Sequence, residues 1–245
     1  MKISLTGKSF LKSNNKNVNK VESGTIFKFK IPFNLGFGYC KLIDFSSLSI
    51  YFGITIKVYD YFGDSEVKSA EFFKGTPLFM NPLPIVKLPS LTGRYMWKKI
   101  GVLQEECDKD IPIYKKYVHE GFGWEAIEEY KKRQWYARVG LQDDIGPLNF
   151  DTVSHLEELF LRSTITIEKR VAMQILRYKG VNVKEFFSAN STDDSWKVDY
   201  NTQQFIPLYK TIPSAIKGKP LIKGFVPDQY LNYRFPLSEE GSANS

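Results

Sequence analysis

The chain has 245 residues, of which 42% are hydrophobic and 25% are charged, and this balance excludes a largely disordered protein. Its formal net charge of +7 favours polyanions at long range but identifies no partner. An apolar run of about 18 residues and a signal-peptide hydrophobic region are both missing, so we expect a cytoplasmic protein without a membrane span. A chain of this length predicts two packed units.

Cysteine and histidine are too scarce for most metal sites. The chain has two of each: Cys40, Cys107, His119 and His155. None of them shows the close paired spacing of a structural zinc site. We therefore expect reduced thiols and neither a bound metal nor another cofactor.

The chain begins with a basic segment, residues 1–20, which contains five lysines and no acidic residue. Such a run is typical of a flexible arm, and it accounts for much of the net charge. A nucleic-acid partner is compatible with this segment but is not required by it.

Residues 21–116 are predicted to form a β-rich unit. Val, Ile, Phe and Tyr dominate four segments, which turn residues separate: 24–33, 39–45, 48–61 and 83–88. In the first, Phe27 and Phe29 fall on one face while Lys28 and Lys30 fall on the other, as in a half-buried strand. Short strands with frequent turns favour a small SH3-like β-barrel or a curled antiparallel sheet.

Residues 117–237 are predicted to form a helical or mixed extension. Segment 123–132 places glutamates before lysines, the order that a helix dipole favours. A second helix is expected to start at Asp151 or Thr152 and to bury one apolar stripe: Val153, Leu156, Leu159 and Phe160.

The clearest helical pattern covers residues 166–179. Its apolar residues recur at helical spacing, and Gly180 stands where a helix ends. Residues 188–195 are expected to form a polar loop, and residues 238–245 a disordered tail. Together these elements predict an α+β protein.

Groups that could carry catalysis are isolated from one another in the sequence. The acidic clusters 105–108, 143–144 and 193–194 adjoin turn or charged residues, which favours solvated loops over buried acid pairs. His119 is predicted to lie in a connector and His155 beside an apolar helix stripe. We therefore expect a protein that is not an enzyme.

Gly36-Phe37-Gly38-Tyr39 suggests an alternative function. It lacks the third glycine and the following helix of a dinucleotide-binding loop. It also approaches the strand motif in which exposed aromatic rings stack on RNA bases, although Leu35 stands where that motif has a basic residue. RNA binding, assisted by the basic segment 1–20, is therefore a second hypothesis.

Six short motifs follow one another across residues 21–116: Glu22-Ser23-Gly24-Thr25-Ile26-Phe27, Gly36-Phe37-Gly38-Tyr39-Cys40-Lys41-Leu42, Ile56-Lys57-Val58-Tyr59-Asp60-Tyr61, Leu83-Pro84-Ile85-Val86, Trp97-Lys98-Lys99-Ile100-Gly101 and Ile111-Pro112-Ile113-Tyr114-Lys115. In kind and order they resemble the Immunity protein 26 family of bacterial polymorphic toxin systems. The resemblance implies a non-catalytic cytoplasmic antitoxin that binds and neutralises a cognate toxin. It does not extend over residues 117–245, and Cys40 stands where a basic residue is more usual.

Protein interfaces centre on aromatic and arginine side chains. Turn-flanked residues of these types are the candidate partner contacts, and core packing is the competing interpretation: Tyr39, Tyr59, Tyr61, Arg94 and Trp97. Because the chain itself is basic, a basic toxin would need a local acidic patch, for which residues 125–129 are the candidate.

Overall fold

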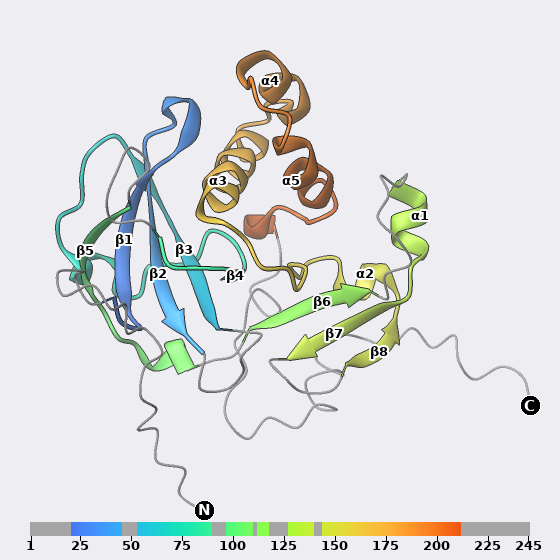
Figure 1. Ribbon diagram of the computed structural model, residues 1–245, viewed down its shortest axis with the longest axis horizontal. Helices are drawn as coiled ribbons and strands as arrows, with labels where there is room; N and C mark the ends of the chain where they lie inside the picture. Colours follow the sequence, from blue (N-terminus) through green and yellow to red (C-terminus); the bar gives the residue numbers. More distant parts are fainter. Residues whose placement is uncertain are drawn as a thin grey trace, which may run out of the picture.

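The computed structural model describes residues 21–45, 53–89, 97–109, 112–117, 127–139 and 144–211. These segments form an α+β protein with two antiparallel sheets and a group of helices (Figure 1). Within them, no helix combines the length and the apolar character that a bilayer crossing requires. The basic segment 1–20 and the tail 238–245 lie outside the described residues.

The first sheet has five strands in the order β4-β3-β2-β1-β5. Their bounds are Thr25–Lys30 for β1, Phe37–Asp44 for β2, Ile54–Gly63 for β3, Leu83–Ile85 for β4 and Lys98–Val102 for β5. In the described part of the chain, the edge strands β4 and β5 do not pair with each other, and β4 bridges to Arg162 instead. The antiparallel sheet is thus confirmed, whereas the SH3-like barrel is not.

Both faces of this sheet are covered. Phe27 and Phe29 of β1 are buried on the face that packs against Val171 of the long helix α3, Thr164–Tyr178. Tyr39 and Tyr59 lie on the opposite face, under the short 3₁₀ helix η2, Ala70–Phe73. The alternation predicted for the first strand is therefore confirmed, because its two faces meet different layers.

The turn from β1 to β2 depends on two glycines. Gly36 has φ +93°, and a Cβ there would lie 2.9 Å from the carbonyl oxygen of Gly63. A Cβ on Gly38 would lie 2.6 Å from the ring of Phe29, and the register between β2 and β3 shifts just after Gly38. The 3₁₀ helix η1, Pro32–Asn34, forms part of this turn, and the register shift after Gly38 marks a β-bulge or irregularity in the sheet.

The second sheet has the order β6-β7-β8, with bounds Ile113–Tyr117, Trp135–Val139 and Ile145–Leu148. The short helices α1, Ile127–Lys132, and α2, Phe150–Val153, accompany it. Sequence reasoning assigned residues 113–116 to the N-terminal unit, but β6 pairs with β7 along its whole length. The predicted boundary at residue 116 therefore cuts through the second sheet.

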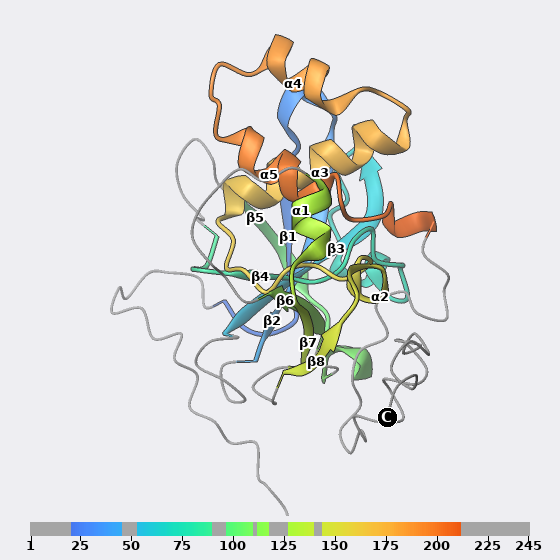
Figure 2. The same ribbon diagram turned by 90° about the vertical axis from the view of Figure 1, so that its right-hand side faces the viewer.

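Helices α3, α4 (Val183–Asn190) and α5 (Trp196–Gln203) gather at one end of the molecule, as Figure 2 shows. Their buried side chains share one apolar cluster with the first sheet. The predicted helix at 166–179 is confirmed as α3, with Gly180 at φ +73° after its end. The predicted polar loop is shorter than expected because α4 continues to Asn190, and α5 was not predicted.

The helix predicted from Asp151 or Thr152 through Phe160 is wrong beyond its first turn. Helix α2 ends at Val153. The backbone N–H of Lys115 donates to the carbonyl oxygen of Glu157 at 2.8 Å, and the backbone N–H of Leu159 donates to the carbonyl oxygen of Lys115 at 2.9 Å. Pairing with β6 has taken the place of the local helical pattern, and Phe160 faces solvent instead of the core.

Candidate partner-binding surface

Three of the predicted contact residues are core side chains. Tyr39, Tyr59 and Trp97 are at most 1% exposed. The Trp97 ring stacks on Phe29 at 4.8 Å, and its Nε1 donates to Glu168 of α3 at 2.6 Å. Their large rings bury more area between the sheet and its covering layers than a surface would offer, so a partner could reach them only if the fold opened.

Tyr61 is the predicted contact residue that remains accessible. Its half-buried ring meets the exposed ring of Phe72 edge to face, at a centroid distance of 4.9 Å. Arg94 lies outside the described residues, and so do residues 125 and 126 of the acidic patch 125–129, in which the Glu129 side chain is exposed. Among the predicted aromatic contacts, all of which the structure describes, Tyr61 is thus the accessible one.

The tetrapeptide considered for RNA stacking does not present two free rings. Tyr39 is buried, and its hydroxyl accepts a hydrogen bond from the backbone N–H of Val67 at 2.9 Å. Phe37 is partly buried, with the ammonium of Lys28 over its ring at 4.4 Å. Base stacking requires open ring faces, so this strand offers a poor platform.

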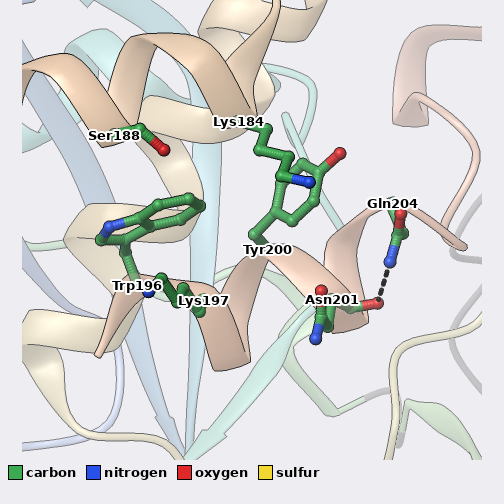
Figure 3. Close-up of a pocket in the computed structure, with 7 residues that line it drawn as sticks. All are labelled: Lys184, Ser188, Trp196, Lys197, Tyr200, Asn201 and Gln204. Atoms are coloured by element: carbon green, nitrogen blue, oxygen red, sulfur yellow. Dashed lines mark hydrogen bonds between the residues drawn. The ribbon is translucent and has the colours of Figure 1, made fainter. Parts of the chain in front are cut away.

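A pocket of about 470 Å³ opens between α4 and α5 (Figure 3). We call it the α4–α5 pocket. Its lining combines two aromatic rings with ammonium, amide and hydroxyl groups: Lys184, Ser188, Trp196, Lys197, Tyr200, Asn201 and Gln204. Sequence reasoning missed it because residues 188–195 were taken for a loop and α5 was not predicted.

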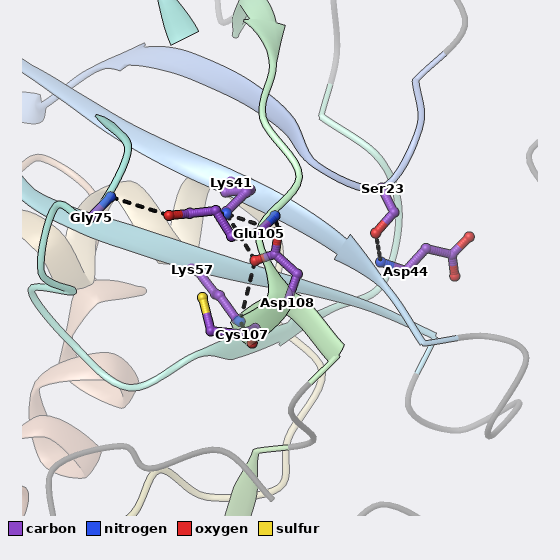
Figure 4. A network of polar contacts seen from close by, with 8 residues as sticks. All are labelled: Ser23, Lys41, Asp44, Lys57, Gly75, Glu105, Cys107 and Asp108. Carbon is purple, nitrogen blue, oxygen red and sulfur yellow. Dashed lines mark hydrogen bonds and ion pairs between the residues drawn. The ribbon is translucent and has the colours of Figure 1, made fainter. Parts of the chain in front are cut away.

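A charged group lies on the first sheet, which we call the Lys41 cluster: Lys41, Lys57, Glu105 and Asp108 (Figure 4). Lys41 and Lys57 are opposite each other on β2 and β3, a placement that repels unless acids neutralise it. Glu105 and Asp108 supply those acids at 2.5 and 2.8 Å from the Lys41 ammonium. The cluster therefore fastens the 3₁₀ helix η3, Glu106–Lys109, to the sheet.

This arrangement corrects the expectation that residues 105–108 form a solvated loop. Potential metal-ligand atoms of Glu105, Cys107 and Asp108 lie within 4.8 Å of one another. However, both carboxylates already serve as counterions of Lys41, and burial raises the pKa of the Cys107 thiol, which disfavours the thiolate that metals bind. The group suits an ion-pair network better than a metal site.

A second charged group, the Arg170 cluster, lies where α3 and α5 meet the second sheet: Lys115, Glu157, Arg162, Arg170 and Asp199. Arg170 donates to Glu157 at 2.6 Å, with both side chains at most 2% exposed. Burial raises the pKa of Glu157, but Arg170 and Arg162 outweigh it and leave that pKa below its usual value. Burial, reinforced by Arg170, lowers the pKa of Arg162 to about 10.

The remaining candidate groups have ordinary structural positions. His155 is buried, as its place beside the apolar stripe suggested, and its carbonyl oxygen accepts from Asn81 at 2.7 Å. Asp193 and Asp194 are exposed and pair with Lys169 and Lys197, each at 3.0 Å, which fits the expected solvated loop. His119 lies outside the described residues.

Exposed apolar side chains occur on the segments that join β4 to the start of α3, and we call this group the β4–α3 patch: Val86, Phe160, Leu161 and Ile165. Val86 is 64% exposed and Phe160 62% exposed. The backbone under the patch is held firmly, because Val86 N–H donates to Arg162 at 3.0 Å and Arg162 N–H donates to Pro84 at 2.9 Å. Clustered exposed apolar side chains of this kind mark interaction surfaces.

Comparison with known proteins adds no relative: no family model, curated protein or solved structure matches this chain. The resemblance to the Immunity protein 26 family thus stays a prediction from short motifs. What the structure contributes is the position of each motif in the fold and the location of the accessible apolar surface.

Proposed function

We propose that this chain is a non-catalytic, immunity-type protein that binds a cognate toxin and neutralises it by covering part of its surface. The observation that carries the proposal is the β4–α3 patch. It presents four exposed apolar side chains, and the backbone segments around them are bonded to both sheets. The toxin as partner comes from the motif resemblance in residues 21–116.

The rigidity of the patch supports a binding role. Leu159 N–H donates to Lys115 of β6 at 2.9 Å, so the chain before Phe160 is anchored to the second sheet. The guanidinium of Arg162 lies over the Phe160 ring at 5.0 Å and orients it. A surface ordered before binding loses little conformational entropy on association, which favours affinity.

In this proposal, the β4–α3 patch forms the centre of an interface. A stable complex buries roughly 800 Å² on each partner, and a few central apolar anchors supply most of the binding energy. Four side chains can supply those anchors, and neighbouring polar residues would form the rim. In this proposal, the two sheets serve as a scaffold that holds the anchors.

The proposal is tested by copurifying the tagged protein with the product of its adjacent gene. Retention by the wild-type protein is expected, together with protection of cells that express that product. Val86→Glu with Ile165→Glu is expected to abolish both, because it places two carboxylates in the interface centre. Val198→Glu is the matched control, since Val198 is also an exposed apolar residue but lies on α5.

Two results would contradict the proposal. Equal retention of the partner by the double variant and by the control would remove the patch from the interface. Salt-dependent retention of RNA, without any protein partner, would favour the nucleic-acid hypothesis instead.

A further inference from the structure

The α4–α5 pocket is built from two helix faces. Lys184 and Ser188 are four residues apart on α4, so they share one side of that helix. On α5, Lys197, Asn201 and Gln204 form one stripe at helical spacing. The polar groups of the pocket thus come from two helices, as Figure 3 shows.

The aromatic floor of the pocket is held in place by the core. Trp196 is buried and packs against Phe187 of α4 at a centroid distance of 5.5 Å. Tyr200 lies one turn further along α5, 6.0 Å from the Trp196 ring, and is only partly buried. The accessible Tyr200 ring therefore rests on the buried Trp196 ring and offers a ligand a preformed apolar wall.

The charge of the lining has one sign. Among the described residues that line it, two carry ammonium groups, Lys184 and Lys197, and none carries a carboxylate. Lys184 lies in the first turn of α4, where the positive helix end disfavours a cation, so local helix stability does not explain it. Lys197 pairs with Asp194 at 3.0 Å, but both side chains are at least 50% exposed, so a ligand carboxylate can replace that weak pair.

We propose that the α4–α5 pocket binds an acidic segment of a protein, with a carboxylate between Lys184 and Lys197 and an aromatic or apolar neighbour against Tyr200. Amide groups of Asn201 and Gln204 supply hydrogen bonds to the peptide backbone. The site is separate from the β4–α3 patch and does not require that the partner be a toxin.

The apolar wall favours a peptide over a bare anion. Phosphate sites usually rely on arginine forks or on converging backbone N–H groups. The described lining has neither arginine nor glycine, and four of its seven residues carry an aromatic ring or an amide. A peptide that has both an apolar and an acidic side chain can contact the aromatic and the ammonium groups of the pocket together.

The test is an NMR titration of the full chain, labelled with ¹⁵N, with a short peptide that has three glutamates around one tyrosine. Backbone signals of Lys184, Ser188, Asn201 and Gln204 are expected to shift. The same peptide with glutamine for glutamate is expected to bind roughly tenfold more weakly, because it loses the charge pairing.

Matched variants locate the effect. Lys184→Gln with Lys197→Gln is expected to weaken the glutamate peptide roughly tenfold, whereas Lys74→Gln with Lys87→Gln, which removes the same charge from exposed sites elsewhere, leaves its affinity unchanged. Equal binding of the two peptides, or equal weakening in both double variants, would overturn the proposal. So would inorganic phosphate that displaces the peptide at the same concentration, since the site would then recognise an anion alone.

The two proposals fail separately. If the patch variant loses partner copurification and the peptide titration shows no shifts, the toxin-binding proposal is supported and the pocket proposal is wrong. If the peptide binds but the wild-type protein retains no partner, the pocket proposal is supported and the toxin-binding proposal is wrong.

Discussion

The Lys41 and Arg170 clusters both place charge inside the protein, but they differ in how their acids meet solvent. In the Lys41 cluster the lysine is 1% exposed, whereas Glu105 and Asp108 keep 20% and 11% of their side-chain surface. In the Arg170 cluster the central pair is closed, with Arg170 and Glu157 at 0% and 2% exposed, whereas the second acid, Asp199, is 12% exposed. A half-open cluster can rehydrate when a partner is removed, and a closed one cannot.

The clusters also join different parts of the chain. The Lys41 cluster fastens η3 to neighbouring strands of one sheet. The Arg170 cluster links α3 to the segment 157–162 and to α5, so it holds together both sheets and the helices. Loss of the second cluster should therefore destabilise the whole molecule.

The largest effect is expected from Glu157→Gln. It leaves Arg170 buried without its 2.6 Å carboxylate partner, and we expect the free energy of unfolding to fall by about 3–5 kcal/mol. Urea denaturation measures this change. The exposed Glu185→Gln is the control and should change stability by less than about 0.5 kcal/mol. A loss from Glu157→Gln no larger than that of the control would show that the closed cluster does not hold the fold.

A smaller loss is expected from Asp108→Asn in the half-open cluster. It leaves Lys41 and Lys57, which lie opposite each other on β2 and β3, with one neutralising acid. We expect the free energy of unfolding to fall by about 2 kcal/mol. Lys41→Met should cost only about 1 kcal/mol, because the remaining carboxylates can take up water. If Lys41→Met proves the more damaging change in urea denaturation, the contrast between the clusters is wrong.

Lys115 adds a pH dependence to the closed cluster. Burial lowers its pKa from 10.5 to about 8, an effect that Glu158 and Glu157 oppose. Between these values the unfolded chain holds a proton that the folded chain has released, so stability rises with pH. Relative to Lys115→Met, the wild-type free energy of unfolding should rise by about 2 kcal/mol from about pH 7 to about pH 10.

The comparison with Lys115→Met removes a contrary effect. Burial raises the pKa values of Tyr59 and Tyr114, so deprotonation of the unfolded chain destabilises both proteins as the pH rises above about 10. Chemical denaturation at each pH gives the difference between the two proteins. A difference that does not change with pH would mean that Lys115 keeps its ordinary pKa in the folded protein.

The smallest effect is expected at the start of α3. Ser163 Oγ accepts from the backbone N–H of Thr166 at 3.2 Å, so Ser163→Ala should lower stability by about 1 kcal/mol. Ser163→Asp, which can make the same bond, should retain most of the wild-type stability. Thermal unfolding of the three proteins measures the order, and an equal loss in both variants would show that the cap bond is not the cause.

Two elements were predictable because local and tertiary preferences agree. In β1, alternation separates Phe27 and Phe29 from Lys28, and the two phenylalanines lie on the face that packs against α3. In α3, helical spacing of apolar residues coincides with a cap at Ser163 and a terminating Gly180. Each signal lies within a few residues of the element that it specifies.

The candidate site was less predictable. Tyr39, Tyr59 and Trp97 have the residue types of an interface, but the same types fill cores, and burial depends on what packs over them. The β4–α3 patch arises because Lys115 pairs with Glu157 and Leu159, which are more than forty residues away along the chain. No local pattern reports such pairing.

By itself, the amino-acid sequence determined the α+β class, the strand alternation of β1, the course of α3 and the turn between segments 24–33 and 39–45, because each depends on short-range periodicity or on a backbone angle. Only the tertiary structure decided that Lys41 and Lys57 face each other under Glu105 and Asp108, and that Phe160 leaves a helical stripe for the surface. Those outcomes depend on contacts between distant segments, whose free energy outweighs local propensity once the sheets form.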